Sequence, residues 1–319
     1  MKEEKAHPLV LFITGRPANE HVERMRAAAP GSDCRYFEKQ AELETEIEQA
    51  DVVAGPISAA ALARAARLKW VHSWAAGPNE QLFPEMVASP VILTCSKSNG
   101  AIPLAEHAMM FMLMLNRQSM HWAQAQTEHR WERRVHGELN GLTCGIIGLG
   151  YSGQDLALKC KAFHMRVIGI SRSGASAPNV DHVFPRERLT CFLHEADFVV
   201  VTAPLTPTTR GMLGEAELRA MKPTAYYICF SRGGIADDAA LLRALREGWI
   251  AGAGLDAHSQ EPLPPDSPFW SAPNAIVTPH NGATTHGTQR RGVDIFVDNL
   301  RRYVAGEPLR NVVDKSAGY

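Results

Sequence analysis

The sequence predicts an α/β fold with two doubly wound parallel sheets, and three observations lead to this prediction. The chain has 319 residues, which exceeds the usual size of one hydrophobic core. Short apolar runs alternate with helix-favouring segments over the first hundred residues, and the same alternation begins again at residue 143. Strand–helix alternation of this kind is typical of parallel sheets that carry helices on both faces.

The first alternation predicts a domain with four strands. The strand candidates are short apolar runs at residues 9–13, 51–54, 69–72 and 91–94. Segments of helical composition lie between them, at residues 19–29, 42–49 and 59–66. Residues 103–130 follow, are rich in Met, Leu, Ala and Gln, and predict a long helix or a helix pair. We place the passage into the second domain there.

The second alternation predicts a sheet of six strands. Its strand candidates are residues 143–147, 166–170, 198–202, 225–229, 251–254 and 275–278. Residues 290–304 are helical again and too short to form a domain, so we expect them to return to the first one. The predicted domains are therefore residues 1–102 with 286–319, and residues 103–285.

Composition and charge exclude several classes of protein. The formal net charge is -1, and the sequence contains no long run of Lys or Arg. It therefore lacks the basic patch that binds nucleic acid or an anionic membrane. The 6 cysteines are far apart without metal-binding spacing, so we expect reduced thiols and no metal site. The longest apolar stretch, residues 101–115, contains Glu106 and His107 and is shorter than the roughly 20 residues that span a bilayer. With no export signal visible, we expect a cytoplasmic protein whose partners are small molecules or a second copy.

A glycine-rich loop follows the strand candidate at residues 143–147 and precedes a helix. It reads Gly148, Leu149, Gly150, Tyr151, Ser152 and Gly153. In this setting Gly148 permits a tight turn, Gly150 lets the backbone approach a pyrophosphate, and Gly153 lets the helix pack on the strand. The loop predicts a dinucleotide site, and the alternative is an ordinary turn between a strand and a helix.

The next strand candidate bears on which dinucleotide binds. An acidic residue at its end would accept bonds from the ribose 2′-hydroxyl of NAD, but the sequence there reads Ser171, Arg172 and Ser173. An arginine between two hydroxyls is suited to a 2′-phosphate. The pattern favours NADP, while NAD stays possible if Arg172 is only a solvated loop residue.

Three later segments carry ionisable side chains after predicted strands, where open α/β sheets bind ligands. They are residues 231–234, 254–262 and 278–281. In these segments and the glycine loop, the chain resembles the D-isomer-specific 2-hydroxyacid dehydrogenase family, and the resemblance covers nearly its whole length. The motifs that carry it are residues 145–150, 203–210, 232–237, 254–256, 261–264 and 278–280.

The resemblance implies a Rossmann cofactor domain inserted in a flavodoxin-like substrate domain, and a homodimer. It implies that Arg232 binds the substrate, that Glu261 is the acid partner of His280, and that His280 donates and accepts the proton. Further cofactor contacts that it implies are Ala203, Pro204, Thr209 and Asp256.

The chemistry requires these residue types independently. Hydride delivery to a 2-keto acid builds negative charge on the carbonyl oxygen, and histidine can supply the proton near neutral pH. Glu261 bonded to the imidazole would set the tautomer of His280, and Arg232 can bind oxygens in a fixed fork. Formate dehydrogenases of the same superfamily usually lack the acid, so Glu261 argues against that branch.

The first domain is expected to supply the substrate wall. Residues 74–77 resemble the family loop whose amides hold the substrate carboxylate, so Trp74, Ala76 and Gly77 are the predicted contacts. Pro78 departs from the family pattern because it has no amide hydrogen. An ordinary strand-to-helix turn is the alternative. Cys229 and Asn281 are further departures near Arg232 and His280.

The sequence thus predicts a reductase for glyoxylate, hydroxypyruvate or a related 2-keto acid that uses NADPH. An NAD-linked dehydrogenase for another D-2-hydroxy acid, such as phosphoglycerate, is one alternative. A cofactor-sensing protein without enzymatic activity is another, because C-terminal-binding corepressors use the same scaffold.

Overall fold

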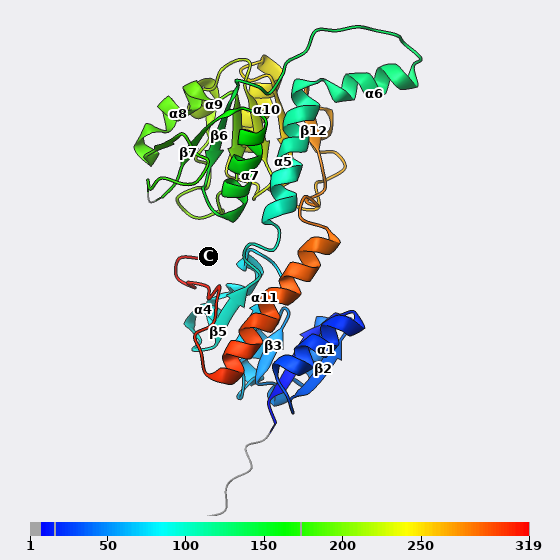
Figure 1. The fold of residues 1–319 in the computed structure, drawn as a ribbon, viewed down its shortest axis with the longest axis vertical. Coiled ribbons are helices and arrows are strands. Elements are labelled where there is room, and N and C mark those ends of the chain that lie inside the picture. Colours follow the sequence, from blue (N-terminus) through cyan, green and yellow to red (C-terminus); the bar gives the residue numbers. More distant parts are fainter. Residues whose placement is uncertain (1–7, 16, 173, 319) are drawn as a thin grey trace, which may run out of the picture. The chain divides into compact units, whose positions relative to one another are not determined.

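The structure is a computed structural model that describes residues 8–15, 17–172 and 174–318. The chain forms two compact units, one comprising Met1–Asn99 with Thr285–Tyr319 and the other Gly100–Thr284. The second unit is therefore an insertion in the sequence of the first (Figure 1). The two crossings predicted from the sequence follow residues 102 and 285.

The first unit contains a five-stranded parallel sheet. Its strands are β1 (Val10–Thr14), β2 (Asp33–Phe37), β3 (Val52–Ala54), β4 (Trp70–Ser73) and β5 (Ile92–Cys95). They lie in the order β2-β1-β3-β4-β5, which is the flavodoxin-like order. β2 was not predicted from the sequence, because this edge strand is only half-buried and Asp33 and Arg35 interrupt its apolar pattern.

Helices cover both faces of this sheet. They are α1 (Asn19–Ala28), α2 (Gln40–Thr45), η1 (Ile47–Gln49), α3 (Ala59–Arg64), η2 (Asn79–Gln81), α4 (Pro84–Ala88) and α11 (His286–Ala305). α11 lies beside α1, and Phe296 and Leu300 of α11 pack with Leu11 and Trp70 of the sheet. The C-terminal helix thereby completes the core of the unit in which the chain begins.

The second unit contains a seven-stranded parallel sheet. Its strands are β6 (Thr143–Ile147), β7 (Arg166–Ile170), β8 (His182–Phe184), β9 (Phe198–Val201), β10 (Tyr226–Cys229), β11 (Gly252–Leu255) and β12 (Ala275–Val277). Their order is β12-β11-β10-β9-β6-β7-β8, so the direction of winding reverses between β6 and β9. The predicted fold class, two parallel-sheet α/β domains, is confirmed. The count of six strands was wrong, because the edge strand β8 is too short to show an apolar run.

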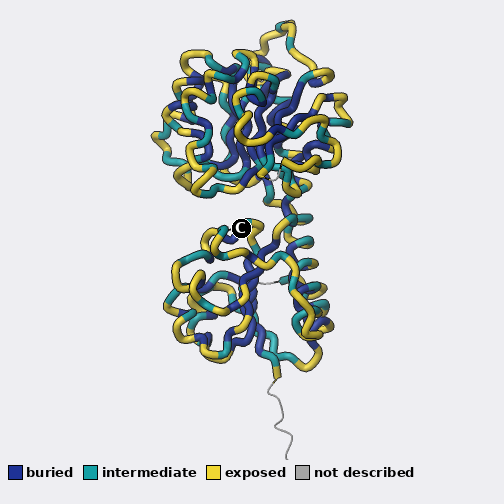
Figure 2. The backbone as a smooth tube through the Cα atoms, turned by 90° about the vertical axis from the view of Figure 1, so that its left-hand side faces the viewer, coloured by how far each residue is buried: buried dark blue, intermediate teal, exposed yellow. Residues whose placement is uncertain are grey.

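Helices enclose the second sheet as well, so that its strands form the buried centre of the unit (Figure 2). They are α5 (Ala101–Asn116), α6 (Ser119–Thr127), α7 (Tyr151–Ala162), η3 (Arg186–Arg188), α8 (Leu189–Glu195), α9 (Glu215–Arg219), α10 (Asp238–Glu247) and η4 (Pro268–Ser271). α5 and α7 pack together on one face, and α8, α9 and α10 cover the other. Over the residues that the structure describes, no helix is both long and apolar enough to cross a membrane.

Candidate active site

The glycine loop joins β6 to α7 at the point where the winding of the sheet reverses. Gly148 has a φ of 103°, a left-handed conformation that favours glycine, and a side chain there would lie 2.7 Å from the backbone nitrogen of Ala203. At Gly153 an added Cβ would lie 2.2 Å from the carbonyl oxygen of Gly148. Gly150 differs, because no atom of the described residues lies within 4 Å of the position of an added Cβ. The fold itself therefore requires glycine at positions 148 and 153. The space beside Gly150 is open, and a phosphate that lies close to the backbone would need such space.

The loop that follows β9 lies against this glycine loop. The amide of Ala203 donates to the carbonyl oxygen of Ile147 at 2.9 Å. Within the same loop, the hydroxyl of Thr209 donates to the carbonyl oxygen of Pro204 at 2.7 Å and accepts from the amide of Thr206 at 2.8 Å. Ala203, Pro204 and Thr209 thus belong to one compact turn beside the predicted dinucleotide site.

Ser171 and Arg172 follow β7, the neighbour of β6. The amide of Gly148 donates to the carbonyl oxygen of Ile170 at 2.9 Å, so the end of β7 adjoins the start of the glycine loop. Arg172 is exposed there. Ser173, the third residue predicted for this position, lies outside the described residues. The positions of Ser171 and Arg172 suit contact with the ribose of a dinucleotide whose phosphates lie on the glycine loop.

His280 and Glu261 form the most direct pair among the predicted catalytic residues. The Nδ1 atom of His280 lies 2.7 Å and 2.9 Å from the two carboxylate oxygens of Glu261. Glu261 also accepts the amide of His258 at 2.9 Å. Partial burial would raise the pKa of Glu261, but these hydrogen bonds outweigh burial, and the pKa is lowered overall. The carboxylate is therefore ionised at neutral pH.

Asp256 holds the main chain around His280. It is fully buried, and its Oδ1 accepts from the Thr278 hydroxyl at 2.6 Å and from the amide of Asn281 at 3.0 Å. Its Oδ2 accepts from the amide of Gly282 at 2.9 Å. His280 has a φ of 51°, a conformation that costs free energy in a residue with a side chain. Because the bonds of Asp256 lie on both sides of His280, they stabilise this backbone conformation.

The resemblance implied a cofactor contact for Asp256, and the structure adds a connection that the sequence analysis did not predict. Nε2 of His107, on α5, lies 3.1 Å from the Thr278 hydroxyl oxygen and 3.6 Å from Oδ1 of Asp256. Burial lowers the pKa of His107, and the opposing charge of Asp256 only partly offsets this. A neutral His107 can donate to Thr278, which in turn donates to Asp256. Only the position of Thr278, two residues before His280, hinted at this network in the sequence.

Arg232 follows β10, which pairs with β11, so Arg232 and Asp256 leave the sheet at the same edge. Nη1 of Arg232 donates to the carbonyl oxygen of Ser231 at 2.7 Å. The thiol of Cys229 donates to the carbonyl oxygen of Arg232 at 3.3 Å. The second unit therefore brings Arg232, Glu261 and His280 to loops at the carboxyl edge of one sheet.

The predicted substrate wall belongs to the first unit. Trp74, Ala76 and Gly77 follow β4, and the indole of Trp74 donates to the carbonyl oxygen of Ala54 at 3.2 Å. Ala76 is exposed. The main-chain oxygen of Trp74 accepts from the side-chain amide of Asn99 at 3.4 Å, which anchors the loop. The contact of these residues with a substrate stays a prediction.

Comparison with known proteins identifies relatives by sequence. Residues 109–282 match the family described as D-isomer specific 2-hydroxyacid dehydrogenase, NAD binding domain. A glyoxylate reductase from Korarchaeum cryptofilum is 33% identical over 269 residues, which make up 82% of this chain and 80% of that protein.

Solved structures show the same similarity in three dimensions. A D-isomer specific 2-hydroxyacid dehydrogenase family protein from Aeromonas salmonicida has a TM-score of 0.88 and 31% identity, over 97% of this chain and 100% of that one. An NADPH-dependent glyoxylate/hydroxypyruvate reductase from Sinorhizobium meliloti, in complex with NADP and sulfate, has a TM-score of 0.84 and 32% identity, over 98% and 100% of the two chains.

Proposed function

Because this chain belongs to the D-isomer specific 2-hydroxyacid dehydrogenase family, we propose that it reduces a small 2-keto acid of the glyoxylate or hydroxypyruvate type with NADPH. The reaction class follows from the family: hydride transfer between a nicotinamide cofactor and a small 2-hydroxy acid. The choice of keto acid and of NADPH is our proposal.

The observation that carries the proposal is the contact between His280 and Glu261. A bound nicotinamide cofactor supplies the hydride, and the carbonyl oxygen that becomes negative needs a proton. With Glu261 on Nδ1 of His280, Nε2 is the atom that exchanges this proton with substrate. The ionised carboxylate stabilises the charged imidazolium from which the proton leaves.

The glycine loop is the proposed site of the cofactor's phosphates. The residues that would hold them are Gly148, Leu149, Gly150, Tyr151, Ser152 and Gly153, at the N-terminus of α7. The open space at Gly150 fits this ligand. Ser171 and Arg172 follow the strand beside the glycine loop and would receive a 2′-phosphate, which supports the choice of NADPH over NADH. The Sinorhizobium meliloti relative, which is NADPH-dependent by its description, agrees with this choice.

Substrate binding is assigned to both units. In the second, the guanidinium of Arg232 would bind the carboxylate and carbonyl oxygens of the keto acid. In the first, the amides of Ala76 and Gly77 would hold the carboxylate, with Trp74 beside them. Pro78 follows Gly77 and offers no further donor.

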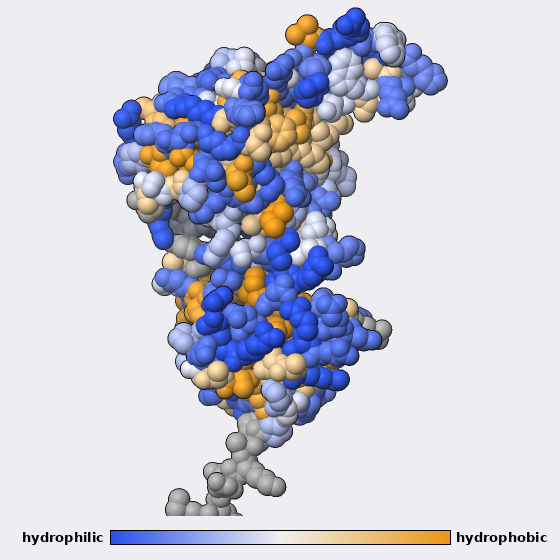
Figure 3. All heavy atoms as spheres, in the orientation of Figure 1, coloured by the Kyte–Doolittle hydropathy of each residue, from blue (hydrophilic) through white to orange (hydrophobic). Residues whose placement is uncertain are grey.

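A homodimer is the proposed assembly. Apolar side chains gather over α5 on the surface of the second unit, as Figure 3 shows, and Met110 and the neighbouring Phe163 are 37% and 41% exposed. Further along the chain, Trp131 and Val135 are almost fully exposed, at 96% and 98%. Adjacent exposed apolar side chains are typical of interaction surfaces, and a second copy is the occupant we propose. Light scattering on the wild type and on Met110→Glu tests it, and a monomeric wild type would refute it.

The absorbance of NADPH and NADH at about 340 nm tests the reaction with a panel of keto acids. We expect turnover of glyoxylate or hydroxypyruvate, with a higher kcat/KM for NADPH than for NADH. Turnover restricted to 3-phosphohydroxypyruvate and NADH would assign the chain to the phosphoglycerate branch. NADPH binding without turnover of any keto acid would favour a cofactor-sensing protein.

A further inference from the structure

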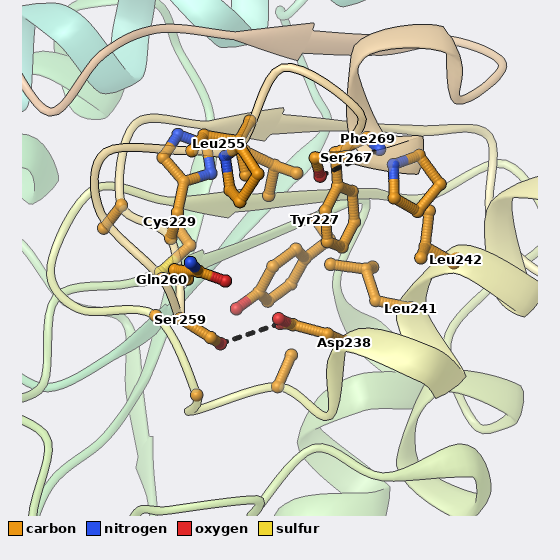
Figure 4. A pocket seen from close by; sticks show the side chains of 18 of the residues that line it. Tyr227, Cys229, Asp238, Leu241, Leu242, Leu255, Ser259, Gln260, Ser267 and Phe269 are labelled. Carbon is orange, nitrogen blue, oxygen red and sulfur yellow. Dashed lines mark hydrogen bonds between the residues drawn. The ribbon is translucent and has the colours of Figure 1, made fainter.

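The second unit contains a cavity of about 340 Å³ behind the loops that carry Arg232 and Glu261 (Figure 4). Its lining includes Gly233 and Gly234, which follow Arg232, and residues 258–260, which precede Glu261. The cavity lies on the α10 face of the sheet. Of the described residues, none that is assigned above to cofactor or substrate lines it.

Three polar groups meet at one side of this cavity. Asp238, the first residue of α10, accepts from the hydroxyl of Ser259 at 3.0 Å. Figure 4 shows the hydroxyl of Tyr227 directed toward the space between Asp238 and Gln260. Tyr227 is only 1% exposed, so its phenol reaches the cavity from the core of the unit.

Two carboxylates and the imidazole of His258 line the cavity. Asp238 and Asp266 both line it, while no lysine or arginine does so among the described residues. Burial raises the pKa of Asp238, and the bond from Ser259 only partly opposes this. A carboxylate in this position is stabilised by a cation that comes close to it.

The remaining walls are apolar. Leu241 and Leu242 of α10 line one side, and Leu263 and Phe269 line another. The volume is within the range of small-molecule sites, which are typically apolar with a few directed polar groups. An occupant therefore needs both an apolar part and a hydrogen-bond donor.

We propose that this cavity binds a small organic cation, a primary ammonium that carries a short apolar group. The ammonium donates to the carboxylate of Asp238 and to the phenol oxygen of Tyr227, and the apolar group packs between Leu241 and Phe269. The two carboxylates disfavour binding of an anionic keto acid, so this site differs from the one proposed for the substrate.

The cavity is connected to Arg232 through Cys229. Cys229 lines the cavity together with Tyr227, and its thiol donates to the main-chain oxygen of Arg232 at 3.3 Å. The two loops are also in close contact, because a Cβ on Gly233 would lie 2.0 Å from the carbonyl carbon of His258. We expect an occupant of the cavity to act on Arg232 through these two loops. This coupling, unlike the binding itself, rests on the proposed function.

Calorimetric titration with isobutylammonium chloride tests the site without any turnover. We expect saturable binding to the wild type, and binding about tenfold or more weaker for the neutral isobutanol. Asp238→Asn and Tyr227→Phe should each weaken isobutylammonium binding, Asp238→Asn by about tenfold or more. Glu247→Gln, which removes an exposed carboxylate from the other end of α10, is the matched control and should bind as the wild type does.

Two results would overturn the binding proposal: no saturable binding of isobutylammonium to the wild type, or equal binding by Asp238→Asn and Glu247→Gln. The coupling is tested by the KM for the keto acid, which should change in the wild type at saturating isobutylammonium and stay constant in Asp238→Asn. An unchanged KM in the wild type would overturn the coupling. A protein without turnover would leave the calorimetric test intact, so failure of the proposed function is distinguishable from failure of the site.

Discussion

Nδ1 of His280 lies 2.7 Å from one carboxylate oxygen of Glu261 and 2.9 Å from the other. This contact leaves Nε2 as the only ring nitrogen that can exchange a proton with substrate. His280→Gln should lower kcat by about 10²- to 10⁴-fold, because the proton donor is lost. The Kd for NADPH, measured by fluorescence titration, should stay nearly constant. Wild-type turnover by His280→Gln would contradict the role of His280.

Glu261 adds a pH dependence to this prediction. The pKa of Glu261 is lowered from its usual 4.5, so the carboxylate stays ionised as the pH falls to 4.5. Its charge interaction with His280 is lost only below that pH. Glu261→Gln keeps an oxygen for Nδ1–H but removes the charge. It should reduce kcat even at neutral pH, and equal pH–rate profiles of the variant and the wild type would show that the charge is not used.

Asp256→Asn tests whether Asp256 positions His280. An amide nitrogen in place of one carboxylate oxygen would face the amide hydrogen of Asn281 or Gly282. We expect kcat to fall about tenfold or more and the free energy of unfolding to fall by about 2 kcal/mol, since a buried hydrogen bond is lost. NADPH affinity should change less than kcat. A larger loss of NADPH affinity than of kcat would instead support the cofactor contact that the resemblance implied.

The glycine loop allows a matched comparison of two alanine variants. Gly153→Ala places a methyl group 2.2 Å from the Gly148 carbonyl oxygen, so thermal unfolding should show a loss of stability of about 1–3 kcal/mol. The added methyl group of Gly150→Ala meets no atom of the described part of the chain within 4 Å, so this variant should fold as stably as the wild type. Its NADPH binding should nevertheless weaken, because the methyl group occupies the space proposed for phosphate. Full NADPH affinity of Gly150→Ala would argue against that site.

Arg172→Asp tests the cofactor preference. The substitution replaces the proposed partner of the 2′-phosphate with an acceptor for the ribose 2′-hydroxyl. We expect the ratio of kcat/KM for NADPH over NADH to fall by about tenfold or more. The exposed Arg243, which lies on α10, provides the control through Arg243→Asp. An unchanged ratio in Arg172→Asp would mean that the 2′-phosphate is bound elsewhere.

His72 predicts an acid limit to stability. It is fully buried, its two ring nitrogens contact the hydroxyls of Thr94 and Ser96, and burial lowers its pKa from 6.5 to about 3. Below pH 6.5 the unfolded chain takes up a proton that the folded chain does not. The free energy of unfolding should therefore fall by at most about 1.4 kcal/mol per pH unit between these values.

Urea unfolding of His72→Asn between pH 7.5 and 5 measures this contribution. The variant should show a shallower dependence on pH than the wild type, whatever its absolute stability. The matched control, His182→Asn at an exposed position, should leave the pH dependence of the free energy of unfolding unchanged. Equal slopes for His72→Asn and the wild type would show that His72 is not the titrating group.

Local sequence patterns were sufficient for the strands at the centre of each sheet. Residues 143–147 and 166–170 were predicted from their apolar runs, and they are β6 and β7. A strand that is buried on both faces has to be apolar at nearly every position, which makes it visible without the fold. Polar residues are tolerated at sheet edges: β2 and β8 were missed there, whereas the edge strands β5 and β12 were predicted from their apolar runs.

The sequence by itself determined the fold class and the types of residue that the chemistry needs, because periodicity and short motifs are local properties. Only the tertiary structure decided which of these residues share hydrogen bonds. His107 lies 171 positions before Thr278, and no spacing in the sequence connects them. Gly150 and Gly153 likewise differ in the space around an added Cβ, because backbone atoms lie close to Gly153 and not to Gly150. Hydrogen bonds and close contacts depend on distances in space, which the packing of distant segments sets.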